Sequence, residues 1–406
     1  MNIGLFTETY YPEINGVANS VYILKKELEE MGHTVYVFTT TTPGAPEYEY
    51  NVFRVPSLPC IFITERRVGL FYQPKLASII KKLNLDLIHT HTEFSLGVFG
   101  RIMARELKIP TVHTYHTIYE DYTHYITHFK SLDKRAKAFV RVFTKICCNT
   151  VEQVVVPTEK VKELLLKYSV FKDISVIPTG VDLKKFNPSL YKDEDIQALK
   201  VEYGIKAEDK VLLYVGRISK EKNIAEIIDA MPAYMKKRPS VKFLIIGGGP
   251  EMDQLKEKVK EYDLTNQIIF TGPKPWDDIG LYYQLGDVFV SASQSETQGL
   301  TYIEAMAGGV PVVAKQDKCL DDILEEGFNG YSFVDSEELI SGLESIFYSE
   351  DNISYGINAM NKMKKYSTEE FANNMVSLYE EIMERQPIFM QRITNEAKKI
   401  NHLFHV

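Results

Sequence analysis

Short apolar stretches alternate with amphipathic stretches along most of the 406-residue chain. The apolar stretch 2–7 is followed by a polar loop and then by residues 17–31, whose apolar positions recur every three to four residues, as on one face of a helix. A second apolar stretch, 34–39, comes next. This strand–loop–helix–strand order predicts parallel strands, since neighbouring parallel strands need a long crossover connection.

The alternation continues to about residue 178 and resumes near residue 210, after an irregular stretch that contains Pro188. A chain of this length also exceeds one ordinary hydrophobic core. The pattern therefore predicts an α/β protein with a domain boundary between residues 178 and 179. Further strands are expected at 51–55, 85–90, 110–115, 153–156 and 174–177, and in the second half at 210–215, 241–246, 267–271, 287–291 and 311–314.

Composition narrows the class of protein. Apolar residues make up 45% of the chain and charged residues 25%, which is typical of a globular protein, and there is no uncharged apolar run of about 18 residues. The first residues lack a basic leader, so we expect a cytoplasmic protein. The four cysteines have neither metal-site nor disulfide spacing, and we interpret most of them as inert thiols.

The net charge of −8 is unevenly distributed. Residues 1–170 hold 20 Lys and Arg against 17 Asp and Glu, a balance of +3, and the remainder holds 27 against 38, a balance of −11. The first half is therefore relatively basic, which favours an anionic partner for that half. The negative total and the absence of a basic face in the second half argue against nucleic acid.

The second half carries polar loops directly after several expected strands. Arg217 and Lys222 straddle a loop-to-helix junction, where two cations and free helix N–H groups suit a diphosphate. A Gly-Gly-Gly-Pro turn follows the next strand, and Glu296 and Glu304 follow a later one. The two carboxylates fit sugar hydroxyls, although a loop acid and a solvated helix acid explain the pair alone equally well. Because parallel strands end at one edge of a sheet, all these loops should converge there.

The first half offers weaker candidates. Gly16 stands at a loop-to-helix junction, where a plain turn is the simpler interpretation. Residues 113–125 are dense in His and Tyr just beyond a strand, which favours a ligand site. Two segments, 59–72 and 130–148, combine basic and bulky apolar residues. Each fits either packing on the domain itself or contact with an anionic bilayer.

These residues together resemble the retaining GT-B glycosyltransferases, in particular the phosphatidylinositol mannosyltransferase-like group. The likeness covers nearly the whole chain and is carried by 15–17, His116, 216–222, 247–250 and 296–304. The strings 114–125 and 297–302 are similar to those of bacterial 1,2-diacylglycerol 3-alpha-glucosyltransferases. Many members of the family have two glycines where this chain has Asn15-Gly16, which is a departure in the first loop.

The resemblance implies two facing Rossmann-like domains: an acceptor and membrane-side domain, 1–178, joined by a helix at 386–406, and a nucleotide-sugar-binding domain, 179–385. It also implies roles for single residues. Arg217 and Lys222 hold the donor diphosphate, Glu296 the transferred hexose and Glu304 the ribose, and His116 lies beside the sugar. The other implied donor-binding residues are Gly16, Gly249, Lys274, Gln298, Gly299 and Leu300. The candidates for acceptor or membrane contact are Tyr119, Tyr122, His124, Phe62, Arg66, Arg67, Lys134 and Arg141.

The function implied is transfer of glucose from UDP-glucose to 1,2-diacylglycerol by a peripheral enzyme on the inner face of the cell membrane. Alternatives are another donor, such as GDP-mannose or UDP-galactose, a soluble acceptor, or a non-catalytic nucleotide-sugar-binding protein. The chain has no Asp-x-Asp motif in a suitable loop. We therefore expect chemistry without a metal or other cofactor, with Arg217 and Lys222 in the place of a divalent ion.

Overall fold

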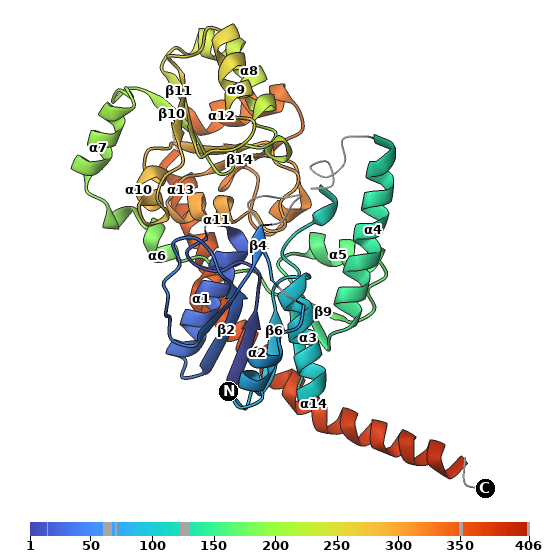
Figure 1. The fold of residues 1–406 in the computed structure, drawn as a ribbon. Coiled ribbons are helices and arrows are strands. Elements are labelled where there is room, and N and C mark those ends of the chain that lie inside the picture. The colour runs from blue at the N-terminus through green and yellow to red at the C-terminus, as the bar shows by residue number, and fades with distance from the viewer. Residues whose placement is uncertain (14, 60–66, 70, 122–129, 349–351, 404–406) are drawn as a thin grey trace. The chain divides into compact units, whose positions relative to one another are not determined.

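The computed structural model describes residues 1–406 except 14, 60–66, 70, 122–129, 349–351 and 404–406 (Figure 1). The chain forms two compact units, Met1–Gly180 with Thr368–Val406, and Val181–Ser367. The first boundary lies close to the expected position, but the chain returns to the first unit at Thr368 rather than at 386. Phe371, Met375 and Tyr379 are the reason, because they are buried in the same core cluster as the first helix of the chain.

The first unit is built on a seven-stranded parallel sheet in the order β3-β2-β1-β6-β7-β8-β9. A two-stranded antiparallel pair, β4 and β5, accompanies it. The strands are β1 (Asn2–Phe6), β2 (Thr34–Thr40), β3 (Val52–Val55), β4 (Leu58–Pro59), β5 (Arg67–Val68), β6 (Leu87–Thr90), β7 (Thr111–Thr114), β8 (Gln153–Val156) and β9 (Asp173–Val176). The helices are α1 (Gly16–Glu30), α2 (Pro74–Ile80), α3 (Ser95–Leu107), α4 (Lys130–Asn149), α5 (Glu159–Lys167) and α14 (Thr368–Leu403).

Helices cover both faces of this sheet, as the alternation of side chains along β1 requires. Ile3 and Leu5 belong to one core cluster together with residues of α1 and α14. Phe6 belongs to another, with residues of α2 and α3. Figure 1 shows α14, in red, returning to this blue-to-green unit. The expected apolar strands are therefore buried on both sides, which explains why they read as continuous apolar runs.

The second unit is built on a six-stranded parallel sheet in the order β12-β11-β10-β13-β14-β15. Its strands are β10 (Lys210–Val215), β11 (Val241–Ile246), β12 (Ile268–Gly272), β13 (Val288–Ser291), β14 (Val312–Lys315) and β15 (Gly330–Phe333). Its helices are α6 (Leu183–Phe186), α7 (Asp193–Glu202), α8 (Ile224–Lys237), α9 (Met252–Glu261), α10 (Ile279–Tyr283), α11 (Leu300–Ala307), α12 (Ser336–Phe347) and α13 (Asn352–Met363). The stretch expected to be irregular up to residue 194 thus holds α6 and the start of α7.

Both sheets reverse their strand order at one point. In the first unit the reversal lies between β1 and β6, and in the second it lies between β10 and β13. Open α/β sheets bind ligands at the carboxyl ends of the strands beside such a point. We therefore expect ligand-binding residues in the loops after these four strands.

Candidate active site

In the second unit, the loops after β10 and β11 run side by side. Ile218 N donates to Gly248 O across 2.9 Å, and Cβ atoms added at Gly247 and Gly249 would overlap the backbone of Gly216 and Ile218, respectively. Gly247 and Gly249 also have φ angles of +143° and +159°. Glycine is therefore required in this turn by close backbone approach as well as by conformation.

The reversal point of this sheet is bridged by an ion pair between two predicted site residues. Lys222 Nζ, after β10, lies 2.5 Å from Glu296 Oε1, after β13. Their side chains are 22% and 16% exposed, so the pair stays reachable for a ligand. Arg217 is exposed in the same loop as Lys222. The structure thus brings together Lys222, one of the two residues expected at the diphosphate, and Glu296, the residue expected at the hexose.

Gly299 forms the N-terminal cap of α11 with a φ of +76°. A Cβ atom here would overlap the ring of Tyr302, which is fully buried and donates from its hydroxyl to Ser291 Oγ at 3.0 Å. Leu300 starts the helix, and Gln298 is buried just before it. The start of α11, four residues after Glu296, therefore depends on a turn that only glycine fits.

Glu304 is buried inside α11, with 4% of its surface exposed. Tyr283 donates a hydrogen bond from its hydroxyl to Glu304 Oε2 at 2.7 Å. Burial raises the pKa of Glu304 to about 7, although the Tyr283 hydrogen bond and the charge of Lys185 both lower it. The carboxyl group therefore exchanges its proton near neutral pH, which distinguishes it from a solvated helix acid.

Lys274, in the loop after β12, lies between two aromatic rings. Its Nζ is 5.4 Å from the ring centre of Tyr203 and 5.3 Å from that of Tyr282. The neighbouring Pro273 lies against the glycine turn, with Pro273 Cδ 3.5 Å from a Cβ placed at Gly248. Lys274 and the turn that contains Gly249 are thereby parts of one edge, as the sequence predicts.

In the first unit, the loop after β1 ends in a side-chain cap. Asn15 Oδ1 accepts from Val17 N at 3.1 Å and Ala18 N at 3.0 Å, and Asn15 Nδ2 donates to Thr9 Oγ1 at 2.7 Å. Gly16 is exposed as the first residue of α1. The departure from two glycines therefore supplies an N-cap, which suits asparagine.

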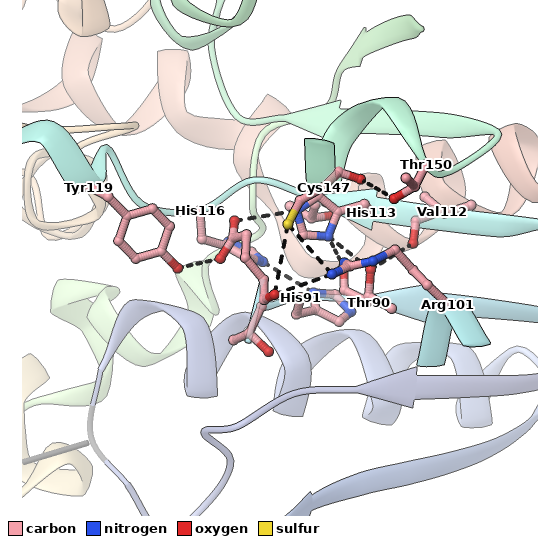
Figure 2. Close-up of polar contacts among 12 residues, drawn as sticks. Thr90, His91, Arg101, Val112, His113, His116, Tyr119, Cys147 and Thr150 are labelled. Carbon is pink, nitrogen blue, oxygen red and sulfur yellow. Dashed lines mark hydrogen bonds and ion pairs between the residues drawn. The ribbon is translucent and has the colours of Figure 1, made fainter. Parts of the chain in front are cut away.

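His116 is half-buried and lies against a group of buried polar residues at the carboxyl ends of β6 and β7 (Figure 2). Its Nε2 is 3.1 Å from His91 Nδ1. Burial and the charge of His113 lower the pKa of His116 to about 3. His116 is therefore neutral throughout the pH range of ordinary assays, so it can orient a ligand but cannot act as a charged acid there.

Glu93 connects the other members of this group. Tyr119 donates to Glu93 Oε2, and His113 Nε2 lies 3.3 Å from Glu93 Oε1. Arg101 Nη2 donates to the backbone oxygen of Glu93 at 3.2 Å. Tyr119 is thus drawn into the same group as His116, as its place in the His- and Tyr-rich string suggests.

Sequence reasoning missed His91, Glu93 and Tyr283. His91 and Glu93 directly follow β6, beside the reversal of the first sheet, and that position was a usable signal. Tyr283 lies 21 residues before its partner Glu304 and ends a short helix, so no sequence pattern pairs them.

The acceptor and membrane candidates have mixed environments. Arg67 donates to the side chain and backbone of Ser57 at 2.8 and 2.7 Å, and Arg141 pairs with Glu120. Lys134 is exposed on α4. Phe62, Arg66, Tyr122 and His124 lie outside the described residues. Both arginines therefore already have partners within their own unit.

Helix α4 presents a mixed face to solvent. Phe139, Val142 and Ile146 are 71%, 57% and 57% exposed, and their spacing places them along one stripe. Exposed basic residues flank the stripe, namely Lys134, Arg135, Arg141 and Lys145. Within the part of the chain that the structure describes, no helix is both long enough and apolar enough to cross a bilayer. The same residues include no group of three or more His, Cys, Asp or Glu side chains arranged to hold a metal ion.

Two parallel-sheet units, each with polar loops at a strand-order reversal, form the architecture of the GT-B fold. Solved structures agree: HepE from Anabaena in complex with UDP superposes with a TM-score of 0.73 at 18% identity, over 94% of this chain and 99% of that one. Sucrose-phosphate synthase from Thermosynechococcus elongatus gives 0.73 at 22% identity, over 94% and 99%.

Sequence comparison identifies the family. The family model described as Glycosyltransferase Family 4 matches residues 14–185, and the one described as Glycosyl transferases group 1 matches residues 195–370. The alpha-monoglucosyldiacylglycerol synthase of Streptococcus pneumoniae is 39% identical, over 93% of this chain and 85% of that protein. The enzyme of the same name from Acholeplasma laidlawii is 36% identical, over 95% and 98%. The chain belongs to the GT-B glycosyltransferases, close to the diacylglycerol glucosyltransferases, and it is a hexosyltransferase.

Proposed function

We propose that this enzyme transfers glucose from UDP-glucose to 1,2-diacylglycerol with retention of the anomeric configuration. The single observation that carries the proposal is the pairing of Lys222 with Glu296 across the reversal of the second sheet. This pair supports the proposal, because a cation suited to the diphosphate would lie next to a carboxylate suited to the hexose. The likeness to two alpha-monoglucosyldiacylglycerol synthases supports the choice of sugar and acceptor.

The proposed reaction breaks the bond between the sugar C1 and the diphosphate oxygen and joins C1 to the hydroxyl oxygen of diacylglycerol. The hydroxyl proton passes to the departing UDP, on the same face of the sugar. Arg217 and Lys222 stabilise the charge that develops on the leaving diphosphate, which is where electrostatic catalysis contributes most. Glu304 binds the ribose, and Lys274 lies beside the base. In this mechanism two cations take the part of a divalent metal ion, and no cofactor is required.

Diacylglycerol lies in a bilayer, so we propose that the first unit contacts an anionic membrane surface, on the inner face of the cell membrane. The exposed stripe on α4 supports this, because bulky apolar side chains flanked by lysine and arginine suit an interface with anionic lipid. Phe139 and Ile146 would enter the interfacial layer, while Lys134 and Lys145 would contact the headgroups.

A product assay tests the function. The purified protein is incubated with UDP-glucose, UDP-galactose or GDP-mannose and vesicles that contain diacylglycerol, with and without a chelator. We expect a monoglucosyl product from UDP-glucose, an α-linkage by NMR, and no loss of rate with the chelator.

Arg217→Ala should reduce the rate at least a hundredfold, the effect of removing one transition-state contact. Lys220→Ala, an exposed lysine in the same loop, is the matched control. Product with a soluble acceptor alone, or near-normal turnover of Arg217→Ala, would refute the proposal.

A further inference from the structure

The contact between His91 and His116 determines which nitrogen of each ring carries the proton. A neutral imidazole carries one N–H and one lone pair, so a hydrogen bond at one nitrogen decides which nitrogen carries the proton. His91 Nδ1 and His116 Nε2 are 3.1 Å apart, and one of them must donate (Figure 2). The free nitrogens of the two rings show which one does.

Both rings are neutral because of where they lie. Burial, together with the charges of neighbouring histidines including His113, lowers the pKa values of His91 and His116.

The two outer nitrogens of the His91–His116 pair differ in their surroundings. His91 Nε2 is sealed from solvent and has no hydrogen-bond partner among the described residues. His116 Nδ1 is not among the sealed, unpartnered atoms, and the described residues offer it no partner. Burying an N–H without an acceptor is costly, whereas a bare ring nitrogen carries no orphaned hydrogen. The proton of His91 therefore belongs on Nδ1, and His91 donates to His116 Nε2.

We propose that His91 is a positioning residue that fixes His116 in its Nδ1–H form, so that His116 offers a neutral hydrogen-bond donor to an oxygen of a ligand bound at the carboxyl ends of β6 and β7. The inference rests on the proposed function for the identity of that oxygen. It assigns His116 a donor role and excludes proton abstraction by its Nδ1. It also explains why two adjoining strand ends each supply a histidine at this point.

The test reads the proton position directly. The full chain, labelled with ¹⁵N in its histidines, is examined by long-range ¹H–¹⁵N correlation without substrates, and His116→Asn assigns the His116 signals. We expect His116 in its Nδ1–H form in the wild type. His91→Asn supplies an amide donor at the position of Nδ1 and should keep that form, whereas His91→Leu supplies no donor and should release it.

Activity gives a second readout. His91→Leu should lower kcat/KM about tenfold, which is the effect of one hydrogen bond, and His91→Asn should stay within about threefold of the wild type. His91→Gln, which carries its amide one atom further out, is the matched control and should resemble His91→Leu. An Nε2–H form of His116 in the wild type would overturn the inference, as would an unchanged His116 signal in His91→Leu. If no variant transfers glucose, the proposed function fails while the spectra still decide the tautomer.

Discussion

Tyr283 donates its hydroxyl hydrogen to Oε2 of Glu304 across 2.7 Å inside the core of the second unit. This bond lowers the pKa of Glu304, whereas burial raises it by more, and the result is a value of about 7. The ribose hydroxyls of a donor need an acceptor, so only the ionised carboxyl group serves them fully. A neutral and an ionised form of the site therefore coexist near neutral pH.

Donor affinity should depend on pH in a defined direction. Because Glu304 loses its proton as the pH rises through about 7, the affinity for UDP-glucose should increase about tenfold between pH 6 and pH 8. UDP-glucose is the suitable probe, since its diphosphate has no second ionisation in this range. Tyr283→Phe removes a contact that lowers the pKa of Glu304 and should move the increase to higher pH. Calorimetric titration measures both effects, with Tyr234→Phe, another buried tyrosine of the second unit, as control. An affinity that stays constant over this range would contradict the assigned role.

The same carboxyl group should make the folded state sensitive to pH. Its pKa is raised from 4.5 to about 7, so its favourable contribution is fully present below pH 4.5 and disappears as the pH rises through 7. A shift of this size corresponds to about 3 kcal/mol. Glu304→Gln should therefore increase the free energy of unfolding at pH 8, by up to about 3 kcal/mol, and change it little near pH 4.5. Urea denaturation at both pH values measures this, and Glu257→Gln, at a site 73% exposed, should show neither effect. Equal unfolding curves of Glu304→Gln and the wild type at pH 8 would show that the site does not stabilise the protonated form.

Lys222 and Glu296 should have separable roles, although they are paired. Glu296→Gln keeps the shape of the side chain but removes the charge that holds Lys222. We expect the affinity for UDP alone to stay the same or to rise, and sugar transfer to fall about a hundredfold. Lys222→Ala should instead weaken UDP binding at least tenfold, because a charge-assisted contact with the diphosphate is lost. Loss of UDP affinity in Glu296→Gln would show that this glutamate supports the nucleotide rather than the hexose.

The turn at Gly299 should tolerate no side chain. Gly299→Ala adds backbone strain at a φ of +76° and also overlaps the ring of Tyr302. Gly204→Ala, at a φ of +64° with nothing within 4 Å of the added atom, carries the backbone strain alone. We expect about 1 kcal/mol of destabilisation for Gly204→Ala and at least twice that for Gly299→Ala, with activity lost only in the latter. Thermal unfolding of both variants makes the comparison, and equal losses would show that Tyr302 moves aside.

The exposed stripe on α4 should determine binding to vesicles. Phe139→Glu places a negative charge among basic neighbours and should weaken binding to vesicles that contain anionic lipid, without changing the unfolding temperature. Val201→Glu, at a position 77% exposed in the second unit, is the control and should bind like the wild type. Co-sedimentation measures binding. If Phe139→Glu bound vesicles as well as the wild type, the exposed stripe on α4 would not be the membrane contact.

The sequence by itself determined the α/β class and most of the strands, because strands buried on both faces read as apolar runs bounded by turn residues. It also predicted that the candidate-site loops share one edge of the sheet, since each follows such a run and the carboxyl ends of parallel strands lie at one edge. The first boundary, near Gly180, follows from the interruption of this alternation between about residues 178 and 210. The return at Thr368 does not, because the apolar face of α14 identifies no partner until Phe371 and Met375 pack with α1.

Only the tertiary structure decided how the side chains at these edges pair. Strand order is not written in any local pattern, yet it places Glu296 beside Lys222 and His91 beside His116. The proton affinities of Glu304 and His116 were likewise beyond sequence reasoning, because they depend on burial by residues distant in the chain. The apolar periodicity of the sequence identifies which residues are buried. The charge and the proton position of a buried group depend instead on the residues that surround it in the folded structure.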